Sequence, residues 1–174
     1  MSGYHAVAVK GRHDPADVIR AVYGVRTGEP VEAAGTGEFP SDGAQPATAV
    51  AGQVEGWTVV CGDFPPDMND DAETARLAEL SRGGTAARWA TESASGALAL
   101  DLFAGGQHQR HFFLVEGEVE GSTGEPLQGE PSGGLHETDP FELDEWTLVE
   151  VVEAHVAPWD AIAQAEYTRF RFQP

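Results

Sequence analysis

The sequence predicts a single α+β domain over residues 1–174, in which an antiparallel or mixed sheet carries helices packed mainly on one face. Strand-like segments outnumber helix-like ones, in the order β-α-β-β-α-β-β-β-α-α-β. Three of the strands, at 85–91, 97–104 and 107–116, follow one another without a helix between them. A doubly wound parallel fold needs helices between most of its strands, so this meander favours the α+β class.

The first half of the chain begins with a strand and a well-bounded helix. Alternating residues in Tyr4–Val9 predict a strand with one buried face. Asp14 is suited to an N-cap, Pro15 to the first helical position, and Gly24 to the end of the helix. Residues 26–46 are rich in Gly, Pro and Glu with little periodicity, which predicts a long surface loop.

Two further strands and a second helix are predicted next. The apolar runs 47–51 and 57–61 are separated by 52–56, a pattern typical of a hairpin. Asp70 or Asp71 then caps a helix that ends before Gly83. The acidic residues around its start are interpreted as capping groups rather than a cation site: Asp67, Asp70, Asp71 and Glu73.

Gly105 and Gly106 are predicted to form the two-residue turn between the second and third strands of the meander, since both can adopt a positive φ. This turn predicts a register in which Asp101 faces Arg110 as a cross-strand ion pair that serves register and solubility. The other predicted pairs are Phe103 with His108, Leu102 with Gln109, Leu100 with His111, and Leu98 with Phe113.

The last third combines an acidic loop with two helices and a strand. Residues 116–138 are predicted to form a second long, negatively charged loop. Asp139 and Pro140 are predicted to open a helix that runs to Val152 with Trp146 on its apolar stripe. A short helix from 158 to 165 leads to a final strand at 167–172.

Charge is the strongest functional signal in the sequence. The chain has 29 Asp and Glu against 10 Lys and Arg, a formal net charge of −19. A chain of this size exposes roughly 8,000 Å², or about one net negative charge for every 400–450 Å². Because such a surface repels phosphates and anionic lipid, we expect no nucleic-acid or membrane partner. It attracts basic proteins, or serves solubility alone.

The sequence lacks the fingerprints of an intramembrane or disulfide-stabilised protein. No run approaches 18 apolar residues, and Met1–Val9 does not have the pattern of a leader, so we expect a cytoplasmic protein. Cys61 is the single cysteine and cannot form an intramolecular disulfide. The high Ala and Gly content, with 9 Arg to 1 Lys, suggests a GC-rich bacterial genome.

No motif predicts a cofactor, a metal ion or catalysis. Phosphate-binding glycine motifs are missing from the sequence. His108 and His111 are three apart in a predicted strand, which places the imidazoles on opposite faces and argues against a shared metal ion. Cys61 has no neighbour in sequence that would activate it and is expected to be a small core residue. The four tryptophans are also expected in the core, at Trp57, Trp89, Trp146 and Trp159.

Three short segments carry a family resemblance: Trp57-Thr-Val-Val, Leu80-Ser-Arg-Gly and 146–155. In these segments and in its acidity, the chain resembles small single-domain actinobacterial proteins, including immunity proteins of polymorphic toxin systems. The resemblance implies a protein that blocks a toxin by stoichiometric binding. It carries no functional residue across.

Three hypotheses of function follow. In the first, a non-enzymatic domain with no catalytic residue docks a basic protein through acidic residues of 116–130, namely Glu116, Glu118, Glu120, Glu125 and Glu130. In the second, the hairpin at 97–116 binds a small ligand or catalyses a reaction with Asp101, His108 and Arg110. In the third, the strand at 167–172 adds to the sheet of a larger assembly.

Overall fold

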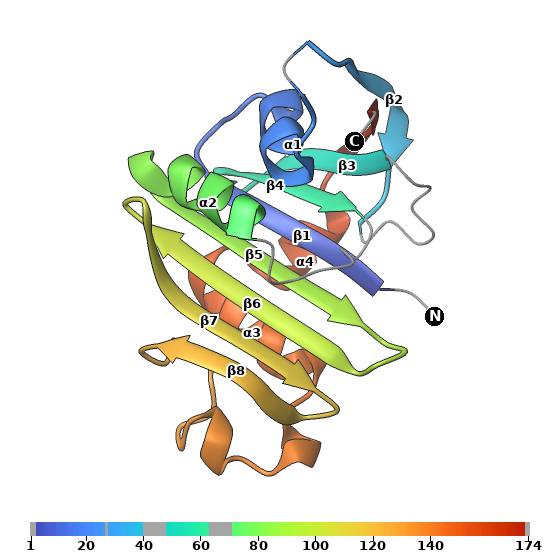
Figure 1. Cartoon of the computed structure of the whole chain (residues 1–174). Helices are drawn as coiled ribbons and strands as arrows, with labels where there is room; N and C mark the ends of the chain where they lie inside the picture. The colour runs from blue at the N-terminus through green and yellow to red at the C-terminus, as the bar shows by residue number, and fades with distance from the viewer. Residues whose placement is uncertain (1–2, 27, 40–47, 63–70, 173–174) are drawn as a thin grey trace.

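A computed structural model describes residues 3–26, 28–39, 48–62 and 71–172 (Figure 1). Its nine strands form one sheet in the order β2-β9-β3-β4-β1-β5-β6-β7-β8. Every pair of neighbouring strands is antiparallel, which confirms the α+β class with an antiparallel sheet. The strands are β1 (Gly3–Lys10), β2 (Val31–Gly37), β3 (Thr48–Val54), β4 (Trp57–Gly62), β5 (Thr85–Glu92), β6 (Ala97–Ala104), β7 (Gln107–Val115), β8 (Glu118–Gly124) and β9 (Tyr167–Phe172).

Helices cover both faces of the sheet, whereas the sequence suggested mainly one (Figure 1). The helices are α1 (Pro15–Tyr23), α2 (Asp71–Leu80), α3 (Glu145–His155) and α4 (Trp159–Gln164), with short 3₁₀ turns at Ser81–Gly83, Leu135–Glu137 and Pro140–Glu142. Ile19 and Leu77 from α1 and α2 pack on one face, and Leu148 and Ile162 from α3 and α4 pack on the other. Central strands explain this arrangement, because all six residues of β4 are buried and both faces therefore need cover.

Helix α1 is bounded as the sequence predicts. The Asp14 side chain accepts a hydrogen bond from the backbone N–H of Ala16 at 2.9 Å, and Gly24 ends the helix in the left-handed region at φ 65°. Arg76 of α2 donates hydrogen bonds from its guanidinium to the carbonyls of Ala21 and Val22 in the last turn of α1. This contact satisfies carbonyls at the helix end and holds α2 beside α1.

The two segments predicted as long loops each contain an edge strand. Within 26–46, β2 pairs with β9, and within 116–138, β8 pairs with β7. Five of the seven residues of β2 are exposed. An edge strand with no buried face needs no alternation of apolar residues, which is why its sequence looked like a loop. Residues 40–47 lie outside the described part of the chain.

The third helix begins at Glu145, later than the predicted start at Asp139. Asp144 is the N-cap, because its side chain accepts a hydrogen bond from the backbone N–H of Trp146 at 2.9 Å. Pro140 instead opens a 3₁₀ turn that precedes the helix. Trp146 lies in the first turn of α3 and is exposed, and the buried residues of α3 are Thr147, Leu148, Val149, Val151 and Val152.

The register predicted between β6 and β7 is confirmed next to the turn and is wrong beyond it. Phe103 faces His108 as predicted, but a β-bulge at Gln109 then shifts the pairing by one residue. Asp101 therefore faces His111, and Arg110 faces Leu102. The predicted ion pair between Asp101 and Arg110 does not form, because successive residues of a strand point to opposite faces.

The final strand β9 lies between β2 and β3 inside the sheet (Figure 1). Both of its edges are paired, so it cannot add to another sheet as the third hypothesis required. Among the described residues, no helix combines the length and apolar character needed to cross a membrane.

Candidate functional site

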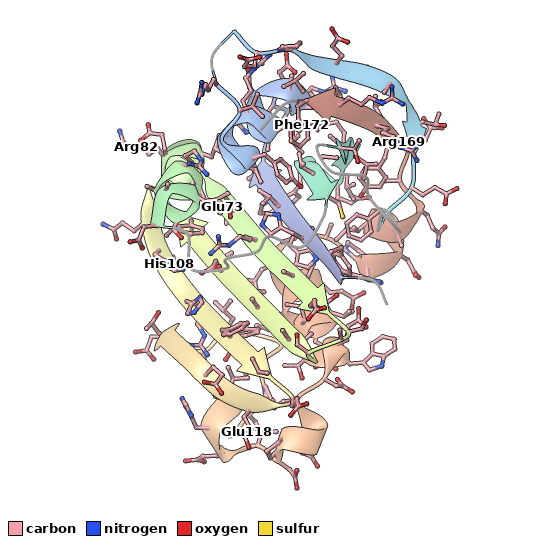
Figure 2. All side chains as sticks on the ribbon, turned by 45° about the vertical axis from the view of Figure 1, so that its right-hand side comes forward. Glu73, Arg82, His108, Glu118, Arg169 and Phe172 are labelled. Atoms are coloured by element: carbon pink, nitrogen blue, oxygen red, sulfur yellow. The ribbon has the colours of Figure 1, made fainter. Side chains whose placement is uncertain are left out.

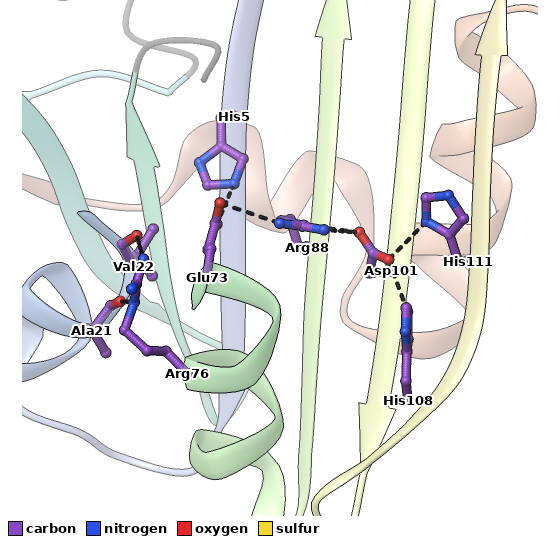
Figure 3. A network of polar contacts seen from close by, with 9 residues as sticks. All are labelled: His5, Ala21, Val22, Glu73, Arg76, Arg88, Asp101, His108 and His111. Atoms are coloured by element: carbon purple, nitrogen blue, oxygen red, sulfur yellow. Dashed lines mark hydrogen bonds and ion pairs between the residues drawn. The ribbon is translucent and has the colours of Figure 1, made fainter. Parts of the chain in front are cut away.

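A row of ionisable side chains crosses four strands on the face covered by α2 (Figure 3). We call it the polar row, and it consists of His5, Glu73, Arg88, Asp101, His108 and His111. The strands β1, β5, β6 and β7 supply five of these residues and α2 supplies Glu73. Figure 2 shows Glu73 between its helix and the sheet. Glu73, expected from the sequence to be a capping group at the start of α2, is instead a buried partner of the sheet, while Asp67 and Asp70 lie outside the described residues.

Arg88 joins the two carboxylates of the polar row. Its Nη1 lies 3.1 Å from Glu73 Oε2, and its Nη2 and Nε lie 2.6 and 2.8 Å from Asp101 Oδ2. Glu73 also contacts His5, with Oε1 and Nε2 2.9 Å apart. All four residues are buried. Burying a charge without a partner is costly, so these pairs account for how the interior accommodates ionised groups.

Two imidazoles share the second oxygen of Asp101. His108 Nε2 lies 2.8 Å and His111 Nδ1 lies 2.9 Å from Asp101 Oδ1. The expectation that these imidazoles occupy opposite faces is wrong, because the bulge at Gln109 adds one residue between them. His108 stacks on the ring of Phe103, with centroids 4.5 Å apart. Side-chain exposure rises from 1% at Asp101 to 17% at His111 and 35% at His108.

The electrostatics of the polar row keep both carboxyls ionised. Burial alone would raise the pKa of Glu73, but its contacts with His5 and Arg88 outweigh burial and lower that pKa. Burial would likewise raise the pKa of Asp101, and the hydrogen bonds from His108 and His111 with the charge of Arg88 hold it well below its usual range. With neutral imidazoles, two carboxylates and one guanidinium leave one net negative charge.

Arg110 is absent from this site because it points to the opposite face. It forms a bidentate ion pair with Glu130, at 2.7 Å from Nε to Oε1 and 2.6 Å from Nη2 to Oε2. Its Nη1 donates to the Ser122 hydroxyl at 2.8 Å and to the Thr123 carbonyl at 3.0 Å. Asp101, His108 and Arg110 therefore do not converge, and the catalytic arrangement suggested from the sequence is wrong.

Glu130 is also unsuited to the predicted role of meeting a partner. Its side chain is 1% exposed, and it accepts hydrogen bonds from Arg110 and from the backbone N–H of Leu127. It pins the segment after β8 against the sheet. The other four predicted glutamates are exposed: Glu116, Glu118, Glu120 and Glu125. Figure 2 shows Glu118 at the end of the molecule remote from α2.

Glu116 lines an acidic pocket of about 430 Å³ on the α3 face of the sheet. The pocket lies between the β5–β6 turn, the β7–β8 turn and the start of α3. Its apolar lining includes Tyr4, Ala97, Leu98 and Leu143, and its carboxylates are Glu92, Glu116, Asp144 and Glu145. Among the described residues that line it, none is basic. The pocket thus combines an apolar surface with uncompensated negative charge.

Trp146 stands directly after two pocket residues in the chain, Asp144 and Glu145. It is 69% exposed. Among the described residues, no other large hydrophobic side chain is exposed. Trp57 and Trp89 are buried as the sequence suggested, and so is Cys61. Sequence reasoning missed the exposure of Trp146 because its spacing to Val149 and Val152 fits the apolar stripe of a helix. The Asp144-Glu145 pair, typical of an N-cap and first turn, was the available signal.

Sequence reasoning also missed His5, Glu73 and Arg88, whose roles depend on contacts between distant segments. No family model matches this chain, and neither a curated protein nor a solved structure matches it significantly.

Proposed function

We propose that this protein is a non-enzymatic cytoplasmic protein-binding domain that docks a basic protein, as an inhibitor or a toxin-immunity protein does. The observation that carries the proposal is the acidic pocket, whose lining residues Asp144 and Glu145 directly precede the exposed Trp146 in the chain. The pocket replaces Glu130 as the centre of the partner-binding surface, and Glu116 remains part of it. The exposed glutamates Glu118, Glu120 and Glu125 add negative electrostatic potential that attracts a basic partner.

The lining of the pocket fits a lysine or arginine side chain. Such a side chain has an apolar stem and a charged head, which can contact different surfaces at once. Leu98 and Leu143 offer the apolar contact, and Glu116 and Glu145 offer carboxylates for the charged head. A volume of about 430 Å³ is within the range of ligand pockets, which is roughly 300–1,000 Å³. An anionic group would meet carboxylates without a counter-charge.

Trp146 supplies the aromatic anchor that such an interface needs. Tryptophan and arginine are enriched among the few residues that dominate binding energy at protein interfaces. An indole ring beside carboxylates can stack on a partner's guanidinium, because the ring face attracts cations. The net charge of −19 adds long-range attraction that raises the association rate with a basic partner.

The first experiment titrates an oligo-arginine peptide into ¹⁵N-labelled protein and follows the indole N–H signal of Trp146. We expect saturable shifts of this signal and of backbone signals at 92–97 and 116–117, and we expect affinity to fall steeply with added salt. An oligo-glutamate peptide of the same length is the ligand control. Shifts spread evenly over all acidic surfaces would contradict a defined site.

Two double charge reversals distinguish binding at the pocket from a general effect of the net negative charge. Glu116→Lys with Glu145→Lys changes the net charge by the same amount as Glu32→Lys with Glu38→Lys, which lie in and after the edge strand β2. We expect the pocket pair to lose binding of the peptide, and of any basic protein recovered by affinity capture, far more than the control pair. Equal losses from both pairs would overturn the placement.

A further inference from the structure

We propose that Asp101, His108 and His111 bind a divalent transition-metal ion of the zinc class. The three side chains each present one donor atom, and these atoms all lie within 4.8 Å of one another. They come from β6 and β7 at the partly exposed end of the polar row (Figure 3). This inference is independent of the proposed docking of a basic protein, since the acidic pocket lies on the α3 face.

The spacing of the donors is close to that of a metal site. Asp101 Oδ1 is 2.8 Å from His108 Nε2 and 2.9 Å from His111 Nδ1. Metal bonds of about 2.0–2.2 Å in tetrahedral geometry place neighbouring donors about 3.3 Å apart. The oxygen and each nitrogen would therefore separate by a few tenths of an ångström, and the two nitrogens, which lie within 4.8 Å of each other, would approach by up to about 1.5 Å. Partly exposed imidazoles can make this adjustment without moving the sheet.

The two ligating nitrogens lose their protons when the ion binds. In the metal-free protein, the Asp101 carboxylate can only accept hydrogen bonds, so His108 Nε2 and His111 Nδ1 each carry a proton. On binding, each of these nitrogens loses its proton, either to the other nitrogen of the same ring by exchange with water or to the solvent. The freed lone pairs and Asp101 Oδ1 then bind the ion.

A chain of supporting contacts orients the carboxylate. Arg88 holds Asp101 Oδ2, Glu73 holds Arg88, and His5 holds Glu73. Asp101 Oδ1 is thus directed at the imidazoles, in the way that hydrogen bonds to ligating side chains orient them in known metal sites. The row carries one net negative charge when the imidazoles are neutral, so a divalent ion adds charge to a region that is negative without it.

The donor set indicates which ions are selected. Two imidazoles and one carboxylate suit zinc and neighbouring transition metals, whereas magnesium and calcium prefer sites made only of oxygen. Three protein donors leave a fourth position of a tetrahedral ion for water. The exposure of His108 places that position on the solvent side of the site.

The test is zinc binding by calorimetry to the full chain after treatment with a chelator. We expect about one zinc ion per chain and no competition from excess magnesium. His108→Ala should weaken binding at least about tenfold, because one of the three donors is lost. His136→Ala removes an exposed histidine outside the site and is the matched control. Circular dichroism of each variant verifies that it folds.

Cobalt absorption gives a second readout, because a four-coordinate ion bound by imidazole absorbs more strongly than the hydrated ion. We expect this absorption in the wild-type chain and in His136→Ala, and its loss in His108→Ala. Zinc binding that is absent from the wild-type chain, or that survives the double change His108→Ala and His111→Ala, would overturn the proposal. Zinc should leave the affinity for oligo-arginine unchanged, so the two proposals fail separately.

Discussion

The polar row contains two carboxylates and the acidic pocket contains four, but among the described residues only the row contains a basic residue, Arg88, that pairs with its carboxylates. In the row, Arg88 lies between Glu73 and Asp101, and the interior is closed around them. In the pocket, four carboxylates line an apolar hollow without a basic residue among its described lining. The paired charges of the row join four strands and a helix, whereas the carboxylates of the pocket face no basic residue within that described lining.

The largest expected effect is on stability, from Arg88→Ala in the polar row. The substitution leaves two buried carboxylates without their shared partner, and we expect the free energy of unfolding to fall by about 3–5 kcal/mol. Urea denaturation measures it. Arg82→Ala is the control, since Arg82 and Glu79 form an exposed pair worth less than about 1 kcal/mol. A loss for Arg88→Ala as small as that of the control would contradict the role of the row.

Trp146→Ala should separate binding from stability. We expect the free energy of unfolding to change by no more than about 0.5 kcal/mol, because the side chain is 69% exposed. Affinity for a basic partner should fall by about 2 kcal/mol or more, as for an interface hot spot. Denaturation and calorimetric titration of one preparation give both values. A stability loss without an affinity loss would make Trp146 part of the fold only.

Two glutamates of the same acidic segment should behave in opposite ways. Glu130→Gln weakens the ion pair with buried Arg110, and we expect a loss of about 1–3 kcal/mol in the free energy of unfolding. Glu116→Gln changes an exposed residue, so we expect a stability change within about 0.5 kcal/mol and weaker binding of the oligo-arginine peptide. Equal destabilisation by both variants would contradict the assignment of a structural role to Glu130 and not to Glu116.

The smallest expected effect is the contribution of Glu73 to the pH dependence of the free energy of unfolding. Its pKa is lowered in the folded state, so the unfolded state takes up protons first as the pH falls. This contribution to stability is fully present above about pH 5 and is lost as the pH falls through and below about 4, near the pKa of an unperturbed glutamate. Urea denaturation at pH 6, 5 and 4 in the presence of a chelator should reveal the onset of the loss. Glu73→Gln should reduce the slope, and an unchanged slope would contradict the assignment.

Local signals predicted much of the fold. Asp14 and Gly24 bound α1, and Gly105 and Gly106 form the turn between β6 and β7, because caps and tight turns depend on a few adjacent residues. The bulge at Gln109 could not be predicted, since it requires no particular residue type and depends on how β6 and β7 twist together. One extra residue was enough to move Arg110 off the face that His108 and His111 share.

By itself the sequence determined the excess of acidic over basic residues, the order of most strands and helices, and the ends of α1. These properties depend only on composition or on residues that are neighbours in the chain. Only the tertiary structure decided which carboxylates are paired. Glu73 meets Arg88 and Glu130 meets Arg110 across separate segments, while Glu116 stays exposed in the lining of the acidic pocket. A glutamate is the same in all three places, and the free energy of its charge depends on burial and on the groups within contact distance.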